Sequence, residues 1–387
     1  MTFAIASNGF ADGPAQALRD YLVARGAHVV TIIHPLTAEQ GTEHVITTYA
    51  DGKRVTERRR RVPLRAPLSF LADPFIPVVG PRADAWFGFN PLACARGLAT
   101  RAPFVVLWSV DFVPDRFGRG TVATRIYDRL DRLCCMRANA RVELSAAARD
   151  ARARRHRLPP DAADAHVVPM GAWLDRVPTA PPDGFGRRRV VFLGHLVERQ
   201  GVDTLLEALA SLAARGEEIG ADIVGTGPLE PALRARSAEL GLDGTVTFHG
   251  YVEDHRDVER ILSGCSVAVA PYRQTAGTFT RYADPGKLKA YLAAGLPIVL
   301  TDVPPKAREL AEHAGAEIVD DDPSAFATGI AHALASPDQW AVRRAAALAY
   351  AQRFDWNTLL DDLLRNLGLV DVSDPSVLEK QGSDPGF

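Results

Sequence analysis

Short apolar runs alternate with helical patterns along most of the 387-residue chain. The first such unit is predicted to be a strand, a helix and a strand at Phe3–Ala6, Pro14–Arg25 and His28–Ile33. In the second half, an apolar strand at Val190–Leu193 precedes a helix that places Leu205, Leu209 and Leu212 on one face. This alternation is typical of parallel α/β sheets. The sequence therefore predicts two doubly wound, Rossmann-like domains whose sheets face each other across a cleft.

Two segments depart from this rhythm. Residues Asp51–Pro77 contain the basic run Arg58–Arg61 and several prolines, which predicts an exposed, irregular excursion. The last residues, 372–387, are polar and contain two Asp-Pro steps, which predicts a disordered tail.

A linker rich in proline and glycine, Thr179–Gly184, marks the expected domain boundary. We predict one domain over 1–178 and a second over 186–340. Helices over 341–371 follow, and the tail completes the chain.

Charge and cysteine content exclude several classes of protein. The 45 lysines and arginines nearly balance the 47 aspartates and glutamates, which gives no reason to expect nucleic-acid binding. The four cysteines form no CxxC pair, which argues against a zinc site or a disulfide framework and fits a reducing compartment. No leader peptide or membrane-spanning run is recognisable, so we expect a cytoplasmic protein.

Three glycine-containing loops follow predicted strands of the second half: Gly194–Gly201, Val224–Leu229 and Phe248–Val252. The first opens a helix, so its N–H groups favour an anion, and His195 and Arg199 add donors or charge. In the third, the groups after Gly250 are placed to meet a nucleotide base. Each loop is also explained by a plain turn that needs glycine, and the residues alone leave both explanations open.

The segment Asp284–Pro297 gives a stronger signal. Pro285 and Gly286 suit a helix start, with Asp284 as a candidate cap. The N–H groups of Gly286, Lys287 and Leu288 and the Lys287 ammonium together predict a cradle for a diphosphate that requires no metal.

Taken in order, these segments carry a family resemblance. Here they read GHLVERQG, GTGP, FHGYV and DPGKLKAYLAAGLPIV. Residues 188–366 resemble the second domain of the retaining glycosyltransferases of family 4, which have the GT-B architecture. Val168–Asp175 is similar to the family's segment near the domain junction, and Phe354–Trp356 to the step before its last helix, which crosses back to the first domain.

The resemblance implies a metal-independent transferase, without a cofactor, that uses a nucleotide diphosphate-sugar donor. The second domain would bind the donor, and the first would bind a glycan, lipid-linked or small-molecule acceptor in polysaccharide biosynthesis. The substrate-binding residues it implies, with the Gly13 loop added as part of the acceptor site, are Gly13, His195, Arg199, Gln200, Gly225, Gly250, Tyr251, Val252, Asp284, Pro285, Gly286, Lys287 and Leu288.

The sequence departs from the family pattern at charged positions. His195 and Gln200 stand where the family has Arg and Lys, and Arg199 is placed to compensate. Tyr282 and Ala290 stand where it has the two glutamates of its E-x7-E motif, so Asp284 is the nearest acid. These departures keep two alternatives open: an epimerase of the same fold, and a catalytically degenerate binding partner of an active transferase.

Two features of the first half complete the predictions. Asp111 follows the predicted strand Phe104–Val110, where side chains face a cleft, and is our candidate catalytic residue; a turn-forming role explains it equally well. We also expect Asp115 and Arg116 to pair locally. The run Arg58–Arg61 suggests peripheral contact with anionic lipid at the inner face of the membrane, against the alternative of a solvated loop.

Overall fold

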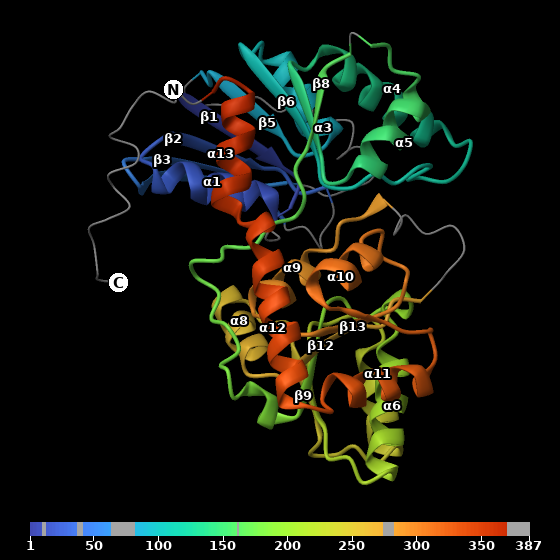
Figure 1. Ribbon diagram of the computed structural model, residues 1–387. Helices are drawn as coiled ribbons and strands as arrows, with labels where there is room; N and C mark the ends of the chain where they lie inside the picture. The colour runs from blue at the N-terminus through green and yellow to red at the C-terminus, as the bar shows by residue number, and fades with distance from the viewer. Residues whose placement is uncertain (10–12, 37–41, 63–81, 161, 274–281, 370–387) are drawn as a thin grey trace. The chain divides into compact units, whose positions relative to one another are not determined.

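The computed structural model describes residues 1–9, 13–36, 42–62, 82–160, 162–273 and 282–369. It divides into two compact units (Figure 1). The N-terminal unit comprises Met1–Pro169 and the segment that begins at Trp356. The C-terminal unit comprises Met170–Asp355.

The N-terminal unit is built on an eight-stranded sheet in the order β4-β3-β2-β1-β5-β6-β7-β8. Its strands are β1 Thr2–Ser7, β2 His28–Ile33, β3 Glu43–Ala50, β4 Lys53–Arg61, β5 Ala85–Gly88, β6 Phe104–Ser109, β7 Ala140–Glu143 and β8 Asp164–Val167. Its helices are α1 Pro14–Ala24, α3 Pro91–Ala99, α4 Val122–Arg137, α5 Ala146–His156 and α13 Trp356–Asn366. All neighbouring strands pair in parallel except β3 with β2 and with β4.

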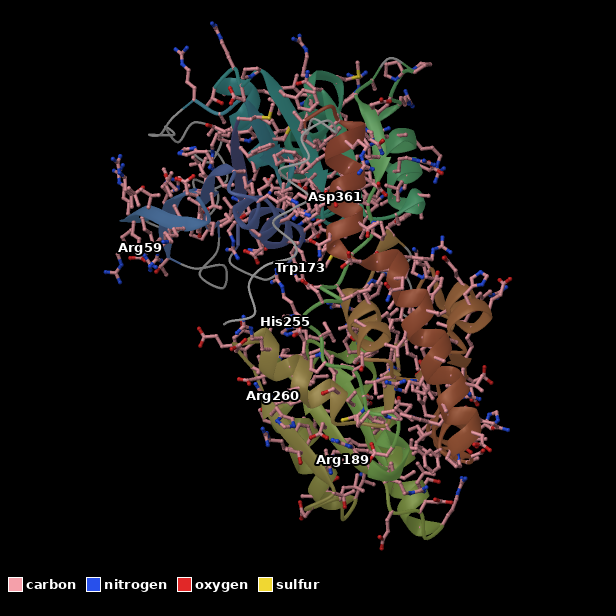
Figure 2. All side chains as sticks on the ribbon, turned by 60° about the vertical axis from the view of Figure 1, so that its left-hand side comes forward. Arg59, Trp173, Arg189, His255, Arg260 and Asp361 are labelled. Carbon is pink, nitrogen blue, oxygen red and sulfur yellow. The ribbon has the colours of Figure 1, made fainter. Side chains whose placement is uncertain are left out.

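Helix α3 packs closely against β5 in the core of this unit. Asn90 caps α3 by accepting a hydrogen bond from the Ala93 N–H at 2.9 Å, and the Trp86 indole N–H donates to the Ala93 carbonyl at 2.9 Å. A Cβ atom at Gly97 would come under 3.0 Å from the Trp86 ring, so glycine is required there. On the chain's last helix, Asp361 accepts from the Tyr21 hydroxyl, which ties α13 to α1 (Figure 2).

The C-terminal unit contains a six-stranded sheet in the order β11-β10-β9-β12-β13-β14, parallel throughout. Its strands are β9 Arg189–Leu193, β10 Gly220–Val224, β11 Val246–Gly250, β12 Val267–Ala270, β13 Ile298–Leu300 and β14 Glu317–Ile318. Its α-helices are α6 Val202–Ala214, α7 Glu230–Glu239, α8 His255–Ser263, α9 Gly286–Ala293, α10 Ala307–Ala314, α11 Pro323–Ala333 and α12 Pro337–Ala351. The strand order 3-2-1-4-5-6 is that of the doubly wound nucleotide-binding fold, so the predicted fold class is confirmed.

The predicted irregular excursion is wrong over residues 53–61. These residues form β4, which pairs with β3 as an antiparallel hairpin at the edge of the sheet. All nine residues of β4 are exposed, so no burial imposes the alternating apolar pattern by which a strand is recognised. Arginines on such an edge discourage pairing with other chains. Residues 63–77 of the predicted excursion, and the predicted tail, lie outside the described residues.

The change between units also differs from the prediction. It falls between Pro169 and Met170 rather than in the segment 179–184, and only the residues from Trp356 onward return to the N-terminal unit. The predicted linker packs on the C-terminal unit because the Ala180 N–H donates to the Ala294 carbonyl at 2.8 Å and the Gly184 carbonyl accepts from Ser266 at 2.8 Å.

The loops after β9 and β10 approach each other through glycine. Gly225 has φ +126, and a Cβ atom there would lie under 3.0 Å from the Gly194 carbonyl oxygen. The Gly194 N–H donates to Val224 at 2.9 Å and the Gly225 N–H donates to Gly250 at 2.8 Å, so main-chain hydrogen bonds join three neighbouring strand ends. Gly225, predicted as a ligand residue, therefore has a packing role.

We predict that Gly225→Ala lowers the free energy of unfolding by about 2–5 kcal/mol, since left-handed strain of about 1–2 kcal/mol adds to overpacking of about 1–3 kcal/mol. Gly241 is the matched control, with φ +69 but open space around it, so Gly241→Ala loses only the strain. Urea denaturation measures both. Equal losses in the two variants would contradict the close approach.

Candidate functional site

The first candidate site lies in the C-terminal unit between β9 and β12. These strands are adjacent, and the chain leaves them toward opposite sides of the sheet. At such a switch point, folds of this kind bind ligands in a crevice at the carboxyl ends of the strands. Phe192 comes from β9, Gln200 from the 3₁₀ turn Glu198–Gln200 that follows, and Tyr272 from the loop after β12. The predicted Gly194–Gly201 loop thus occupies the switch point of the sheet.

Lys287, on the first turn of α9, occupies this crevice. Its Nζ lies 2.6 Å from Gln200 Oε1 and 4.3 Å from the ring centroids of both Phe192 and Tyr272. Burial, together with the nearby Arg199, lowers the pKa of Lys287 well below its ordinary value. Ring faces and an amide oxygen stabilise the ammonium, and an incoming anion would stabilise it further.

The start of α9 presents donors without an opposing acid. The helix begins at Gly286, its N-cap Pro285 makes no side-chain capping bond, and its first turn has no acidic residue. In the described part of the chain, the N–H groups of Gly286 and Lys287 have no backbone acceptor, whereas that of Leu288 donates to Pro285 at 3.2 Å. Two of the three N–H groups expected to face a ligand are therefore available, and Leu288 itself is buried.

Asp284 has a different role from the one predicted. It is buried, one carboxylate oxygen pairs with the Lys289 ammonium, and the other accepts from the Met170 N–H at 2.7 Å. Because both oxygens are engaged elsewhere, Asp284 does not cap α9. It anchors the start of α9 to the segment that enters the unit at Met170. The sequence shows Lys289 five positions later but gives no periodic signal for this pair.

The remaining predicted residues lie at the same edge of the sheet but are not equivalent. His195 is exposed, and the Arg199 carbonyl accepts from the Arg273 N–H at 3.0 Å. Gly250 ends β11 with φ +68, and Tyr251 beside it is 75% exposed, whereas Val252 packs on the core. Since β11 is two strand positions from β9, Tyr251 is about 10 Å away from the β9 loop along the sheet.

The second candidate site is a cavity of about 450 Å³ within the N-terminal unit. Loops after β1, β5 and β6 and the start of α1 form it, so it too lies where the strand order reverses, between β1 and β5. Lining residues that bear on function are Asn8, Gly13, Asn90, Asp111, Arg116 and Tyr127. Gly13 and Asp111, predicted separately, are thereby brought to one cavity.

Polar groups of this cavity are paired with one another. Asp111, half exposed, accepts from Arg116 at 2.5 Å, so the pairing expected between Asp115 and Arg116 is wrong; Asp115 pairs instead with Arg155 at 2.6 Å. The Asn90 amide donates to the Asn8 side chain, whose own amide donates to the His34 carbonyl at 2.6 Å. Sequence reasoning missed Asn8 and Asn90, although Asn8 directly follows β1 and Asn90 comes two residues after the end of β5.

Two negative findings concern the described residues only. Among them, no three histidine, cysteine, aspartate or glutamate side chains are grouped as a metal site would require. All four cysteines are buried and free.

Comparison with known proteins identifies the C-terminal unit. Residues 187–336 match the family model described as "Glycosyl transferases group 1". The chain is 28% identical over 185 residues to a GDP-mannose-dependent alpha-(1-6)-phosphatidylinositol dimannoside mannosyltransferase of Mycobacterium tuberculosis, covering 48% of this chain and 45% of that protein. It is 30% identical over 220 residues to a phosphatidyl-myo-inositol mannosyltransferase of Mycolicibacterium smegmatis, covering 55% and 54%. The chain thus spans about half the length of these curated relatives.

Solved structures match over nearly the whole chain. Sucrose-phosphate synthase from Thermosynechococcus elongatus aligns with a TM-score of 0.67 at 18% identity, over 95% of this chain and 99% of that one. HepE from Anabaena in complex with UDP-glucose aligns with a TM-score of 0.64 at 16% identity, over 96% and 100%. The chain is therefore similar to the glycosyl transferases group 1 family over residues 187–336 and has the GT-B fold of these solved glycosyltransferases.

Proposed function

We propose that this protein transfers a sugar, with retention of anomeric configuration, from a nucleoside-diphosphate sugar to a hydroxyl group of an acceptor. The observation that carries the proposal is Lys287, held at the uncapped start of α9 by Gln200 and two aromatic rings, in a glycosyl transferases group 1 domain. The donor diphosphate would lie against this lysine and the N–H groups of Gly286 and Lys287.

Sugar transfer from a nucleoside diphosphate requires stabilisation of the negative charge on the leaving group. The bond between the anomeric carbon and the diphosphate oxygen breaks, and a bond from the acceptor oxygen forms. Negative charge accumulates on the leaving diphosphate, where the Lys287 ammonium and the α9 dipole stabilise it. The helix dipole and the N–H groups of Gly286 and Lys287 can stabilise the diphosphate without requiring a metal. The mannosyltransferase relative is named for GDP-mannose and the HepE complex contains UDP-glucose, so we propose the nucleoside diphosphate as the shared chemistry.

The acceptor would bind in the cavity of the N-terminal unit. Its amides and aromatic walls suit a polyhydroxylated ring, and the charges of Asp111 and Arg116 compensate each other. The acceptor hydroxyl must lose its proton during transfer. We propose that the Asp111 carboxylate orients this hydroxyl or receives that proton.

A lipid-linked acceptor would place the protein at a membrane surface. No helix in the described part of the chain is long and apolar enough to span a bilayer. Arg54 and Arg59 of β4 pair with Glu57, and Arg59 also pairs with Glu43. Arg58 and Arg60 form no ion pair with any residue that the structure describes, and Arg59 beside them reaches outward (Figure 2). We propose that Arg58 and Arg60 contact anionic headgroups.

We predict that Lys287→Ala weakens nucleoside-diphosphate binding by about 1.5–3 kcal/mol, the scale of a charge-assisted hydrogen bond. Since burial lowers the pKa of Lys287 and a bound anion favours the ammonium, binding should take up a proton, and affinity should fall as pH rises through that pKa. Calorimetry in buffers of different ionisation enthalpy measures both effects.

Lys306→Ala is the control, because Lys306 lies over the Phe354 ring, 5.0 Å from its centroid, and not in the Lys287 crevice. Affinity and proton uptake should stay at wild-type values in this variant. Unchanged affinity in Lys287→Ala, with the fold intact, would exclude the diphosphate assignment.

We predict that Asp111→Asn lowers turnover about 10²–10⁴-fold while donor affinity is preserved, because the donor binds in the other unit. Asp115→Asn is the matched control in the same loop, since it breaks only the Asp115–Arg155 pair. Initial rates and nucleotide calorimetry separate the two effects. Wild-type turnover in Asp111→Asn would return this residue to the role of a turn former, and bound nucleotide without any wild-type turnover would identify a binding partner instead of an enzyme.

We predict that Arg58→Gln/Arg60→Gln weakens binding to vesicles rich in anionic lipid by about 2 kcal/mol, at about 1 kcal/mol for each arginine. Arg54→Gln/Arg59→Gln removes the same charge from the same strand and should lose less, because glutamates already neutralise these arginines. Co-sedimentation measures binding. Equal binding to neutral and anionic vesicles, or equal losses in the two variants, would reject the surface.

A further inference from the structure

A cluster of buried charges lies beneath the loop that carries Asp111. Its centre is Arg152 of α5, whose side chain is 2% exposed. One guanidinium nitrogen lies 2.5 Å from both carboxylate oxygens of Asp131 on α4, and Nε lies 2.8 Å from Glu143 at the end of β7. His156 adds a contact of 2.7 Å to Asp131.

Asp131 and Glu143 hold Arg152 in place. Burial opposes ionisation of Asp131, yet Arg152 and His156 outweigh it, and the pKa of Asp131 lies below its ordinary value. Burial raises the pKa of Glu143. A guanidinium held between two buried carboxylates has little freedom to reorient, so its remaining nitrogen has a defined direction.

That remaining nitrogen points to the end of β6. It donates to the Ser109 hydroxyl and lies 3.4 Å from the Asp111 carbonyl oxygen, to which the Ser109 hydroxyl in turn donates at 2.9 Å. The guanidinium carbon also lies 5.1 Å from the centroid of the Phe112 ring. The Asp111 carbonyl is therefore held by hydrogen bonds from the buried side, while the Asp111 side chain lines the cavity.

We infer that Arg152, acting through the Ser109 hydroxyl, is the positioning residue that fixes the direction of the Asp111 carboxylate in the acceptor cavity. This inference rests on the proposed function for the role of Asp111. Burying several charges is costly in desolvation free energy and adds little stability compared with an apolar core. Positioning of Asp111 would give this buried cluster a function other than stability. Arg152 itself does not line the cavity.

The test uses Ser109→Ala in the full chain, because replacing Arg152 would leave Asp131 and Glu143 buried without a partner and endanger folding. Ser109→Ala removes only the hydroxyl bridge. Ser145→Ala is the matched control: Ser145 caps α5, the helix that carries Arg152, by accepting from the Ala148 N–H at 3.1 Å.

Two measurements decide the inference. Amide hydrogen exchange over residues 110–117 should quicken roughly tenfold in Ser109→Ala but not in Ser145→Ala, since Ser109→Ala removes the hydroxyl that donates to the Asp111 carbonyl at 2.9 Å. Turnover should fall about five- to tenfold in Ser109→Ala with donor affinity unchanged, and this loss should vanish in the Asp111→Asn background, because a residue acting through Asp111 has nothing left to orient.

Unchanged exchange in Ser109→Ala, or an additive loss of turnover in the double variant, would overturn the inference. Failure of the proposed function is a separate result. It would appear as wild-type protein without transfer activity, and the exchange measurement would still decide whether the Ser109 bridge fixes the loop.

Discussion

Reversal of the strand order is the constraint on which both candidate sites depend. In a parallel sheet wound in two directions, the helices that follow two adjacent strands leave toward opposite faces, and the loops between them separate. This happens between β9 and β12 in the C-terminal unit and between β1 and β5 in the N-terminal unit. The Lys287 crevice and the cavity at Asp111 lie at these two places.

Buried ion pairs lie next to the backbone of each candidate site. Asp284 and Lys289 fix the start of α9, so that Lys287 two residues away meets Gln200. Arg152, Asp131 and Glu143 lie under the Asp111 loop. Buried pairs of this kind are costly to desolvate and intolerant of losing one member. However, the directional contacts of these ion pairs restrict the positions that the neighbouring backbone can take.

The structure shows what surrounds the positions at which this sequence departs from the family pattern. Ala290 packs against the core, so its position on α9 contributes no polar group. Asp284 is committed to Lys289 and Met170, so the unit contains no simple replacement at that point. Gln200, standing where the family has a lysine, instead accepts a hydrogen bond from Lys287. In this arrangement Lys287 lies beside Gln200 and close to Arg199, and it is the residue on which the proposed donor binding depends.

The sequence by itself determined the fold class, the elements of the second half and the helix start that carries Lys287. These depend on local patterns: apolar runs of strand length, glycine after a strand, and proline at the first turn of a helix. Only the tertiary structure showed that β4 is an edge strand, because an exposed strand carries no apolar alternation. It alone also paired Asp284 with Lys289, gathered Asn8, Asn90 and Asp111 around one cavity, and placed Arg152 beneath them. Those residues come from separate elements, and the distances between their side chains are set by how the sheet is wound and not by spacing along the chain.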